Sequence, residues 1–525
     1  MKVPLNVRRF LDHAASIYGD KIGVIDQDGQ WTYREFKERA WRLTNALKAM
    51  GVQAGDRVAV LGYNNHPLLE AYYGVVQFGA VLVPLNIRLT LEEIAYIASD
   101  CQPKVLLFDS DFEAWAVELR TRLPGLSLVE IRIEGGHQGY QGYEELLAQG
   151  SPEPLLDMVD EDSVAEIFYT SGSTARPKGV ALTQRSLYLH ALQCGFGMGI
   201  DDTMVLLHTI PLFHVNGWGT PHYVTALGGT HVMLRRFIPA QVLELVERYR
   251  VTNAAFVPTM VGMLLSEPTR EIRDLSSLRQ MNVGGAPSPS SFVAASMAAL
   301  GGEYLGGYGL SESSPVVSVS RLKSSLRDAP RELQDRLRGF AGLPMVGVEV
   351  RLEGPLGEEL PWDGESVGEL LVRADSVMQG YWNLPEETEA ALRGGWLHTG
   401  DMAFIHPEGY IKIVDRKKDI IISGGENISS TEIEDVLYGH PAVRECAVVG
   451  RPDEKWGEVV HAAVSLKPGL AAATPEEILA YVRGRVASFK APRTIEIWDD
   501  LPKTGTGKVL KTAIRSRLRQ EAEGR

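Results

Sequence analysis

The sequence predicts an α/β protein: a large N-terminal domain of helix-covered sheets, a β-rich subdomain, and a small mobile C-terminal α+β lobe. Three observations predict this fold. Strand-like and helix-like segments alternate between Arg57 and Thr170, short strands separated by turns follow Arg338, and helices and strands alternate again after Asp415. Repeated strand–helix alternation implies a parallel sheet covered by helices. We therefore expect a large domain over residues 1–415, with its β-rich part at about 338–415, and a small domain over 416–525.

The first domain contains apolar strand segments joined by helical ones. The predicted strands are residues 57–61, 80–84, 104–108, 167–170, 254–257 and 281–283. A helix is predicted over 66–78, and a capping box of Thr90 and Glu93 opens another helix at Leu91. Several of these strands end in loops rich in Gly, Ser, Thr or Pro. Ligands of open α/β sheets bind beyond the carboxyl ends of the strands, so these loops are the first candidates for a site.

The later part of the chain changes character. Short alternating strands are predicted at 346–352, 368–373 and 410–414, which is typical of a β-rich subdomain. The charged segment after Asp415 is the best candidate for an interdomain hinge.

Composition excludes some classes of function. The formal net charge is −14, which works against nucleic-acid binding, because phosphate contacts need a basic surface. The most apolar stretch, residues 71–85, is shorter than a membrane span, and the N-terminus lacks the features of a secretory signal. The three cysteines are far apart and form no CxxC pair, which indicates reduced thiols. We therefore expect a cytoplasmic protein without a transmembrane segment.

The strongest chemical signal is the segment from Tyr169 to Gly179, where a strand leads into hydroxyls, glycines and a Pro-Lys-Gly. Hydroxyl and backbone N–H donors in such a loop can surround phosphate oxygens, and Lys178 adds a positive charge. The segment lacks the Walker A pattern. An ordinary Ser/Gly-rich turn is the alternative for a bare loop of this composition, but the preceding strand and the Pro-Lys-Gly favour nucleotide binding.

Four further segments indicate a binding site only when they are considered together. Residues 308–312 offer an aromatic ring, a hydroxyl and a carboxylate suited to Mg²⁺. Residues 396–401 end in a carboxylate that could accept ribose hydroxyls, although a turn with an Asp cap is the alternative. Residues 211–218 could line an acyl pocket. Residues 503–508 place a lysine on a Gly-rich loop, where an ammonium could stabilise developing charge, although a solvated surface lysine is the alternative.

Together these segments resemble the motifs of the acyl-adenylate-forming superfamily, which includes acyl-CoA synthetases, peptide-synthetase adenylation domains and luciferases. The resemblance extends from the Trp31-Thr32-Tyr33-Arg34-Glu35 run to Lys508. It implies an AMP-forming acid–thiol ligase that uses ATP and Mg²⁺ to activate a carboxylic acid and then transfers the acyl group to coenzyme A.

The resemblance also implies roles for individual residues. The implied catalytic residues are Lys508, His214 and Thr170. The implied ATP- and AMP-binding residues are Thr170, Ser171, Gly172, Ser173, Thr174, Lys178, Gly284, Gly285, Ala286, Pro287, Tyr308, Gly309, Ser311, Asp401, Arg416 and Lys508. The implied acyl pocket consists of His214, Val215, Gly217, Trp218 and Gly309, and the coenzyme A channel of Ser423, Gly424, Gly425 and Glu426. Glu312 would bind the metal and Asp415 would act as the hinge.

Substrate choice depends on finer resemblances. The segments 213–218 and 423–430 resemble the fatty-acyl branch, which favours a medium- or long-chain fatty acid. A short or sulfur-containing acid such as 3-methylmercaptopropionate, or loading of a carrier protein, stays open. A non-catalytic nucleotide-binding regulator ranks low, because Lys508 and Glu312 are both present. Ala175 stands where many relatives have Gly, which predicts a less mobile phosphate loop. The resemblance to this superfamily also suggests that the protein forms a homodimer.

Overall fold

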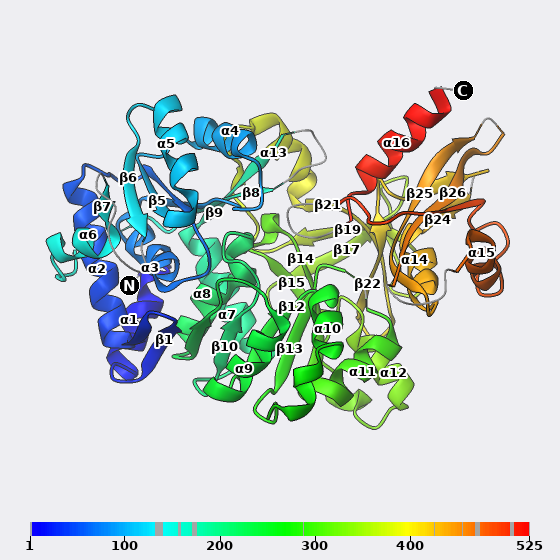
Figure 1. Ribbon diagram of the computed structural model, residues 1–525, viewed down its shortest axis with the longest axis horizontal. Coiled ribbons are helices and arrows are strands. Elements are labelled where there is room, and N and C mark those ends of the chain that lie inside the picture. Colours follow the sequence, from blue (N-terminus) through cyan, green and yellow to red (C-terminus); the bar gives the residue numbers. More distant parts are fainter. Residues whose placement is uncertain are drawn as a thin grey trace. The chain divides into compact units, whose positions relative to one another are not determined.

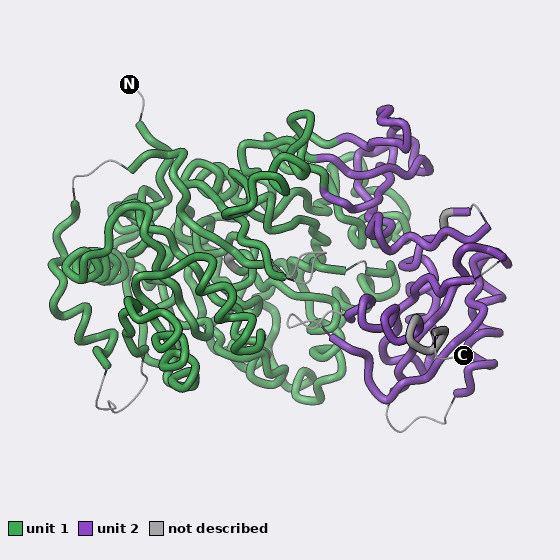
Figure 2. Tube along the Cα trace, turned by 90° about the horizontal axis from the view of Figure 1, so that it is seen from above, with its two compact units in different colours: residues 1–350, 372–398 green, residues 351–371, 399–525 purple. Residues whose placement is uncertain are grey.

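The computed structural model describes residues 3–131, 140–155, 159–170, 176–286, 288–424, 426–453, 455–467, 473–503 and 509–523. The chain forms two compact units, which Figure 2 shows in different colours. The large unit comprises Met1–Val350 and Val372–His398, and the small unit comprises Arg351–Leu371 and Thr399–Arg525. Residues 351–371 and 399–415, which the sequence analysis assigned to the large domain, thus group with the small unit. The hinge role of Asp415 stays a prediction.

A nine-stranded sheet forms one half of the large unit, with the strand order β16-β15-β14-β13-β12-β10-β11-β1-β2. Its strands are β1 (Ile22–Asp26), β2 (Gly29–Thr32), β10 (Val205–His208), β11 (Thr230–Met233), β12 (Asn253–Phe256), β13 (Gln280–Gly284), β14 (Glu303–Gly309), β15 (Val316–Val319) and β16 (Leu343–Pro344). The strands from β1 to β14 in this order pair in parallel, whereas β2, β15 and β16 pair antiparallel. The helices between its strands (Figure 1) are α8 (Val215–Ala226), α9 (Pro239–Tyr249), α10 (Pro258–Leu265), α11 (Ser290–Leu300) and α12 (Arg331–Arg338).

An eight-stranded sheet forms the other half, in the order β20-β9-β8-β4-β3-β5-β6-β7. Its strands are β3 (Arg57–Leu61), β4 (Val81–Pro84), β5 (Val105–Asp109), β6 (Ser127–Ile131), β7 (Gln141–Gly142), β8 (Val164–Thr170), β9 (Lys178–Thr183) and β20 (Gly380–Tyr381). The helices of this part are α2 (Tyr33–Ala49), α3 (His66–Gly74), α4 (Leu91–Cys101), α5 (Glu113–Arg122) and α6 (Tyr143–Gln149), and α7 (Gln184–Met198) follows β9. The predicted capping box is confirmed, because the Thr90 N–H donates to Glu93 Oε2 over 2.8 Å.

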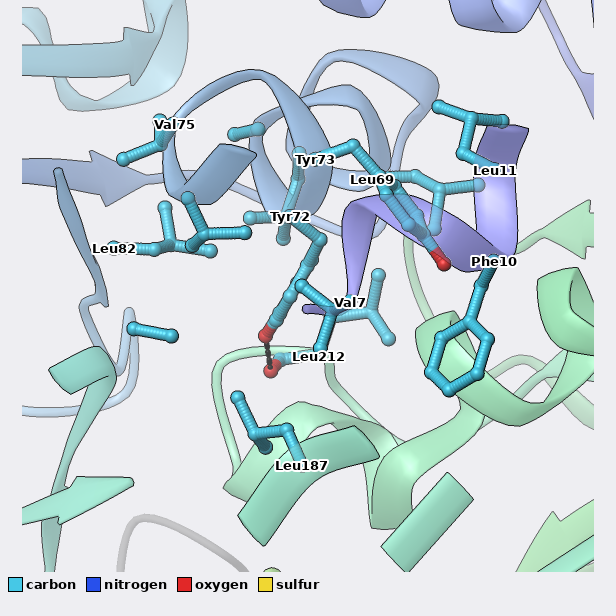
Figure 3. Packing of buried hydrophobic residues seen from close by; sticks show 14 of the residues in the cluster. Val7, Phe10, Leu11, Leu69, Tyr72, Tyr73, Val75, Leu82, Leu187 and Leu212 are labelled. Atoms are coloured by element: carbon cyan, nitrogen blue, oxygen red, sulfur yellow. Dashed lines mark hydrogen bonds between the residues drawn. The ribbon is translucent and has the colours of Figure 1, made fainter. Parts of the chain in front are cut away.

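A large apolar cluster joins both halves of the large unit (Figure 3). Val7 and two residues of α1 (Arg8–Ile17), Phe10 and Leu11, pack with Tyr72 and Tyr73 of α3, and all five side chains are buried. Burial of one large apolar side chain contributes about 1.5–3 kcal/mol to the free energy of folding. The many buried side chains of this cluster therefore stabilise the packing of the two sheets and of the helices between them.

The small unit contains two sheets of its own. Most of a five-stranded sheet of order β18-β17-β19-β21-β22 belongs to it, and a second sheet pairs β24, β23, β26, β25 and β27. The strands are β17 (Glu349–Glu353), β18 (Glu359–Leu360), β19 (Gly368–Arg373), β21 (Leu397–Ile405), β22 (Ile411–Arg416), β23 (Ile421–Ser423), β24 (Glu426–Ile428), β25 (Val443–Asp453), β26 (Gly457–Leu466) and β27 (Thr494–Ile497). Three helices, α14 (Ser430–Tyr438), α15 (Pro475–Arg483) and α16 (Lys511–Glu523), complete the lobe. The predicted β-rich and α+β parts are therefore confirmed as fold classes.

The cysteines and the helices bear on two expectations from the composition, reduced thiols and no transmembrane segment. Cys101, Cys194 and Cys446 are buried and unpaired, and burial raises the pKa of the Cys101 thiol to about 12. Within the described ranges, every helix is too short or too polar to cross a lipid bilayer.

A buried histidine links three elements of the large unit. His66 Nδ1 lies 3.1 Å from Asp26 Oδ2, and His66 Nε2 lies 3.7 Å from Glu144 Oε1. Burial alone would lower the pKa of His66, but hydrogen bonds to Asp26 and Glu144 and the nearby charge of Glu70 raise this pKa to about 9. The imidazolium is thus stabilised in the folded state.

This raised pKa predicts a pH-dependent contribution to stability. Because the folded pKa exceeds the unfolded value of about 6.5, the contribution is complete below about pH 6.5 and is lost as the pH rises through about 9. At about 1.4 kcal/mol per pKa unit, it amounts to about 3 kcal/mol. We expect His66→Gln to remove this increment, which denaturant unfolding at pH 6.5 and pH 9 would measure. An identical pH dependence in the variant and the wild type would contradict the assignment.

Candidate functional site

The predicted phosphate loop closes a β-hairpin in the large unit. Strands β8 and β9 pair antiparallel, with Thr170 opposite Lys178 and Tyr169 opposite Gly179. Residues Ser171, Gly172, Ser173 and Thr174 of the predicted loop lie outside the described residues. Since paired strands lie about 5 Å apart, the hairpin holds the two ends of the loop close together.

Tyr381, which the sequence analysis missed, connects two predicted site residues. The Lys178 ammonium lies 5.2 Å from the centre of the Tyr381 ring, and the Tyr381 hydroxyl donates to Glu312 Oε1 over 2.8 Å. The Met378 N–H also donates to the Glu312 carbonyl over 2.8 Å. Tyr381 reaches this position because β20 pairs with β9, a pairing that no local pattern near residue 381 predicted.

These contacts orient the half-buried carboxylate of Glu312 toward the same tyrosine that the Lys178 ammonium contacts. Carboxylate oxygens are ligands that Mg²⁺ prefers, and Mg²⁺ sites on proteins commonly use one or two of them together with substrate phosphates. Glu312 therefore fits the predicted metal role.

The predicted adenine segment follows β13. Gly284 pairs with Gly307 of β14, and Gly285 has a φ of +87°, a backbone conformation that favours glycine. Tyr308 and Gly309, expected after a strand, belong to β14 itself. A Cβ atom on Gly309 would lie only 1.9 Å from the Pro315 carbonyl oxygen, so only glycine fits there.

Nearby, Ser311 is buried and Glu312 follows it in a short 3₁₀ turn, while Ala286 is exposed. Pro287 lies outside the described residues.

The predicted acyl segment forms an unusual start to α8. His214 precedes the helix and its N–H donates to the Pro211 carbonyl over 3.0 Å. Val215, Gly217 and Trp218 have φ values of +41°, +52° and +72°. Positive φ is rare for a β-branched residue such as valine, so the surrounding structure must hold this turn in place.

Trp218 brings the acyl segment to the adenine segment. A Cβ atom on Gly284 would lie 3.2 Å from Trp218 Cη2, so the indole packs against this glycine. The large unit thus brings together two motifs that the sequence suggested separately.

A fully buried pair ties α8 to the phosphate hairpin. His222 Nε2 of α8 lies 2.7 Å from Glu166 Oε1 of β8, and both side chains are at most 1% exposed. The rings of Tyr72 and Tyr73 stand edge-on to His222, with centroid distances of 5.8 and 5.9 Å. Removing one partner of a buried hydrogen bond typically costs about 1–3 kcal/mol, because the other polar group is left without its partner.

The predicted ribose residues face each other in the small unit. Asp401 of β21 pairs with Arg416 of β22, and Asp401 Oδ1 lies 2.8 Å from Arg416 Nε. The Asp401 side chain is 4% exposed and that of Arg416 51%. The alternative interpretation of residues 396–401 as a capped turn is wrong, because Asp401 lies within a strand.

Asp415 is buried within β22. Its Oδ1 accepts from the Arg416 N–H over 2.8 Å, and its Oδ2 accepts from the N–H and hydroxyl of Ser430 over 2.7 and 2.6 Å. The Lys511 ammonium donates to the same Ser430 hydroxyl over 2.5 Å and pairs with Glu434 over 2.8 Å. The predicted hinge residue is thus bonded to the start of α14, and the first residue of α16 bonds the same Ser430 hydroxyl. Lys508 itself lies outside the described residues.

The predicted coenzyme A loop connects β23 and β24, with Ser423 opposite Glu426. Gly424 has a φ of +60°, and a Cβ atom there would lie 2.7 Å from Trp456 Cε3. Gly425 lies outside the described residues.

Trp456 is a second residue that the sequence analysis missed. The residue is 38% exposed, and the cationic groups of Lys455 and Arg493 lie 5.0 and 5.6 Å from the centre of its ring. The sequence does show a tryptophan next to Lys455, which could have drawn attention to it. Its contact with Gly424 could not be predicted, because the two residues are distant in sequence.

Comparison with known proteins agrees with this arrangement. The model of the AMP-binding enzyme family matches residues 11–382, and that of the AMP-binding enzyme C-terminal domain matches residues 432–508. The chain is 40% identical to a feruloyl-CoA synthase of Amycolatopsis sp, covering 93% of this chain and 94% of that protein. It is 37% identical to a long-chain-fatty-acid–CoA ligase of Thermus thermophilus, covering 99% and 96%.

A solved structure supports the same conclusion. The anthranilate CoA ligase AuaEII in complex with anthranoyl-AMP superposes with a TM-score of 0.90 at 27% sequence identity, covering 100% of this chain and 99% of that one. The chain therefore belongs to the AMP-binding enzyme family and to the acyl-adenylate-forming superfamily of ligases.

Proposed function

We propose that this acid–thiol ligase converts a medium- or long-chain fatty acid to its acyl-CoA thioester through an acyl-adenylate. The Lys178–Tyr381–Glu312 arrangement at the end of the β8–β9 hairpin carries the proposal, because one tyrosine connects a lysine to a carboxylate of the kind that Mg²⁺ prefers. Family membership over nearly the whole chain supports the reaction class.

In the first step, a carboxylate oxygen of the acid attacks the α-phosphorus of ATP and pyrophosphate leaves. Thr170 and Lys178 would bind the phosphates, and Glu312 would hold Mg²⁺, which supplies positive charge to the phosphates when bound. The Lys508 ammonium would offset charge that develops at the α-phosphate. Positioning and electrostatic stabilisation of this kind carry phosphoryl chemistry, so no side chain needs to be acylated.

Separate residues would bind the two parts of the nucleoside. Tyr308 and the segment Gly284–Ala286 would bind adenine, and the carboxylate of Asp401, oriented by Arg416, would accept the ribose hydroxyls. In the second step, the thiolate of coenzyme A attacks the acyl carbonyl and AMP leaves. The Gly424–Glu426 loop and Trp456 would bind coenzyme A, since an exposed tryptophan near two cations suits an aromatic, phosphorylated ligand.

Two acids are favoured by specific observations. The fatty acid follows from the resemblance of segments 213–218 and 423–430 to the fatty-acyl branch and from the similarity to the Thermus ligase. A hydroxycinnamic acid such as ferulate is the second candidate, because the feruloyl-CoA synthase shares the higher identity. A hydrophobic pocket distinguishes one methylene by only about 1–3 kcal/mol, so measurement must decide between them.

A panel of acids tests the proposal directly. We expect medium- or long-chain fatty acids to give the highest rate of AMP release, and the release to depend on coenzyme A once the first turnover is complete. A preference for ferulate would favour the second candidate. If no acid of the panel led to release of AMP, or if ADP were released instead, both candidates would be contradicted.

Lys508→Ala separates the two steps. We expect acyl-AMP formation, measured as exchange of pyrophosphate into ATP, to fall at least roughly 100-fold, because a preorganised charge at the phosphate is lost. Thioester formation from supplied acyl-AMP should persist. Lys503→Ala is the control, since Lys503 lies in the same segment but pairs with Glu445 over 3.0 Å. Equal loss of both steps in Lys508→Ala would refute the assignment.

Trp456→Ala tests the coenzyme A surface. We expect the KM for coenzyme A to rise roughly tenfold, since loss of an aromatic contact of about 1.4 kcal/mol changes affinity by this factor. The KM values for ATP and acid should stay within about twofold. Trp362→Ala is the matched control, because Trp362 is also an exposed tryptophan of the small unit, at 44% exposure. An unchanged KM for coenzyme A in Trp456→Ala would remove this residue from the proposed site.

A further inference from the structure

The backbone between β10 and α8, residues 209–214, is held by an asparagine from a distant part of the chain. Asn64 Nδ2 donates to the carbonyls of His208 and Ile210, each over 2.9 Å, and Asn64 Oδ1 accepts from the Leu212 N–H over 2.7 Å. Asn64 is 4% exposed. Its amide therefore bonds backbone groups of three residues, His208, Ile210 and Leu212, in the segment that leads into His214.

A buried tyrosine also bonds the same segment. The Tyr72 hydroxyl donates to the Leu212 carbonyl over 2.6 Å, which Figure 3 shows as a dashed line. Asn64 and Tyr72 thus bond both backbone groups of Leu212, its N–H and its carbonyl. Leu212 lies only two residues before His214 and three before the left-handed residue Val215.

Asn64 is itself fixed in place. It lies between β3 and α3, and the next residue, Asn65, caps α3 by accepting from the Leu68 N–H over 2.9 Å. Strand β3 belongs to the eight-stranded sheet and β10 to the nine-stranded sheet, so Asn64 fastens the acyl segment of one sheet to the framework of the other. Only an amide supplies two donors and an acceptor in this geometry, and a carboxylate would face two carbonyl oxygens with no proton to donate.

We propose that Asn64, assisted by Tyr72, is a positioning residue for the carboxylic acid. Their four hydrogen bonds fix the path of residues 209–214, and this path sets where the strained turn with Val215 and Trp218 begins. A strained turn keeps its geometry only when its surroundings determine it, so the shape of the acid pocket depends on these bonds. The inference rests on the proposed function, in which this turn lines the acid pocket.

The test is Asn64→Asp, which preserves size and removes both donors. We expect the KM for the acid in ATP–pyrophosphate exchange to rise at least roughly tenfold, equivalent to about 1.4 kcal/mol, while the KM for ATP stays within about twofold of the wild type. Tyr72→Phe, which loses one bond and keeps the packing, should change the acid KM in the same direction by about threefold, since one net hydrogen bond contributes about 1 kcal/mol or less. Tyr72→Phe also keeps the test valid if Asn64→Asp fails to fold.

Asn45→Asp is the matched control. Asn45 Nδ2 makes the same kind of bonds, to the carbonyls of Ser151 and Glu153 over 2.7 and 3.0 Å, but on the α2 surface of the same unit. The KM of the Asn45→Asp variant for the acid should equal that of the wild type. A lower melting temperature in the Asn64 and Tyr72 variants with an unchanged acid KM, or a parallel rise in both KM values, would overturn the inference and leave a purely structural role. Absence of exchange by the wild type with every acid would instead refute the proposed function.

Discussion

The register of the β8–β9 hairpin is the constraint on which the proposed nucleotide site depends. It sets Thr170 opposite Lys178 and gives β9 a free side on which β20 pairs, so that Tyr381 reaches both Lys178 and Glu312. Because side chains alternate between the faces of a strand, a slip of one residue would turn Lys178 to the opposite face. Lys178 would then no longer contact the Tyr381 ring, whose hydroxyl bonds Glu312.

The acid pocket depends on the same strand through α8. Glu166 and Thr170 lie on one face of β8, and Glu166 pairs with His222 one helical turn beyond Trp218. Trp218 in turn packs on Gly284, and Asn64 holds the backbone before the helix. Contacts therefore lead from the phosphate hairpin through α8 to the adenine segment, all within the large unit, and they connect the segments that are proposed to bind the acid and the nucleotide.

Much of the fold was predictable because its signals are local. The strands at 57–61 and 368–373 and the Thr90 capping box have the predicted bounds, since alternation and capping involve neighbouring residues. Tyr381, Trp456 and Asn64 were not predicted, because each acts through a partner that is distant in sequence. Asp401 looked equally like a turn residue, since its strand is defined by pairing with β22 and not by its own sequence.

The central claim, that the acid is activated as an acyl-adenylate before transfer to coenzyme A, is tested most directly with an acid labelled with ¹⁸O in both carboxylate oxygens. If the carboxylate attacks the α-phosphorus, one labelled oxygen stays bound to that phosphorus when the thiolate displaces AMP. The account predicts one ¹⁸O atom in each AMP and one in the thioester carbonyl. Unlabelled AMP, or label recovered in pyrophosphate or in inorganic phosphate together with ADP, would contradict it.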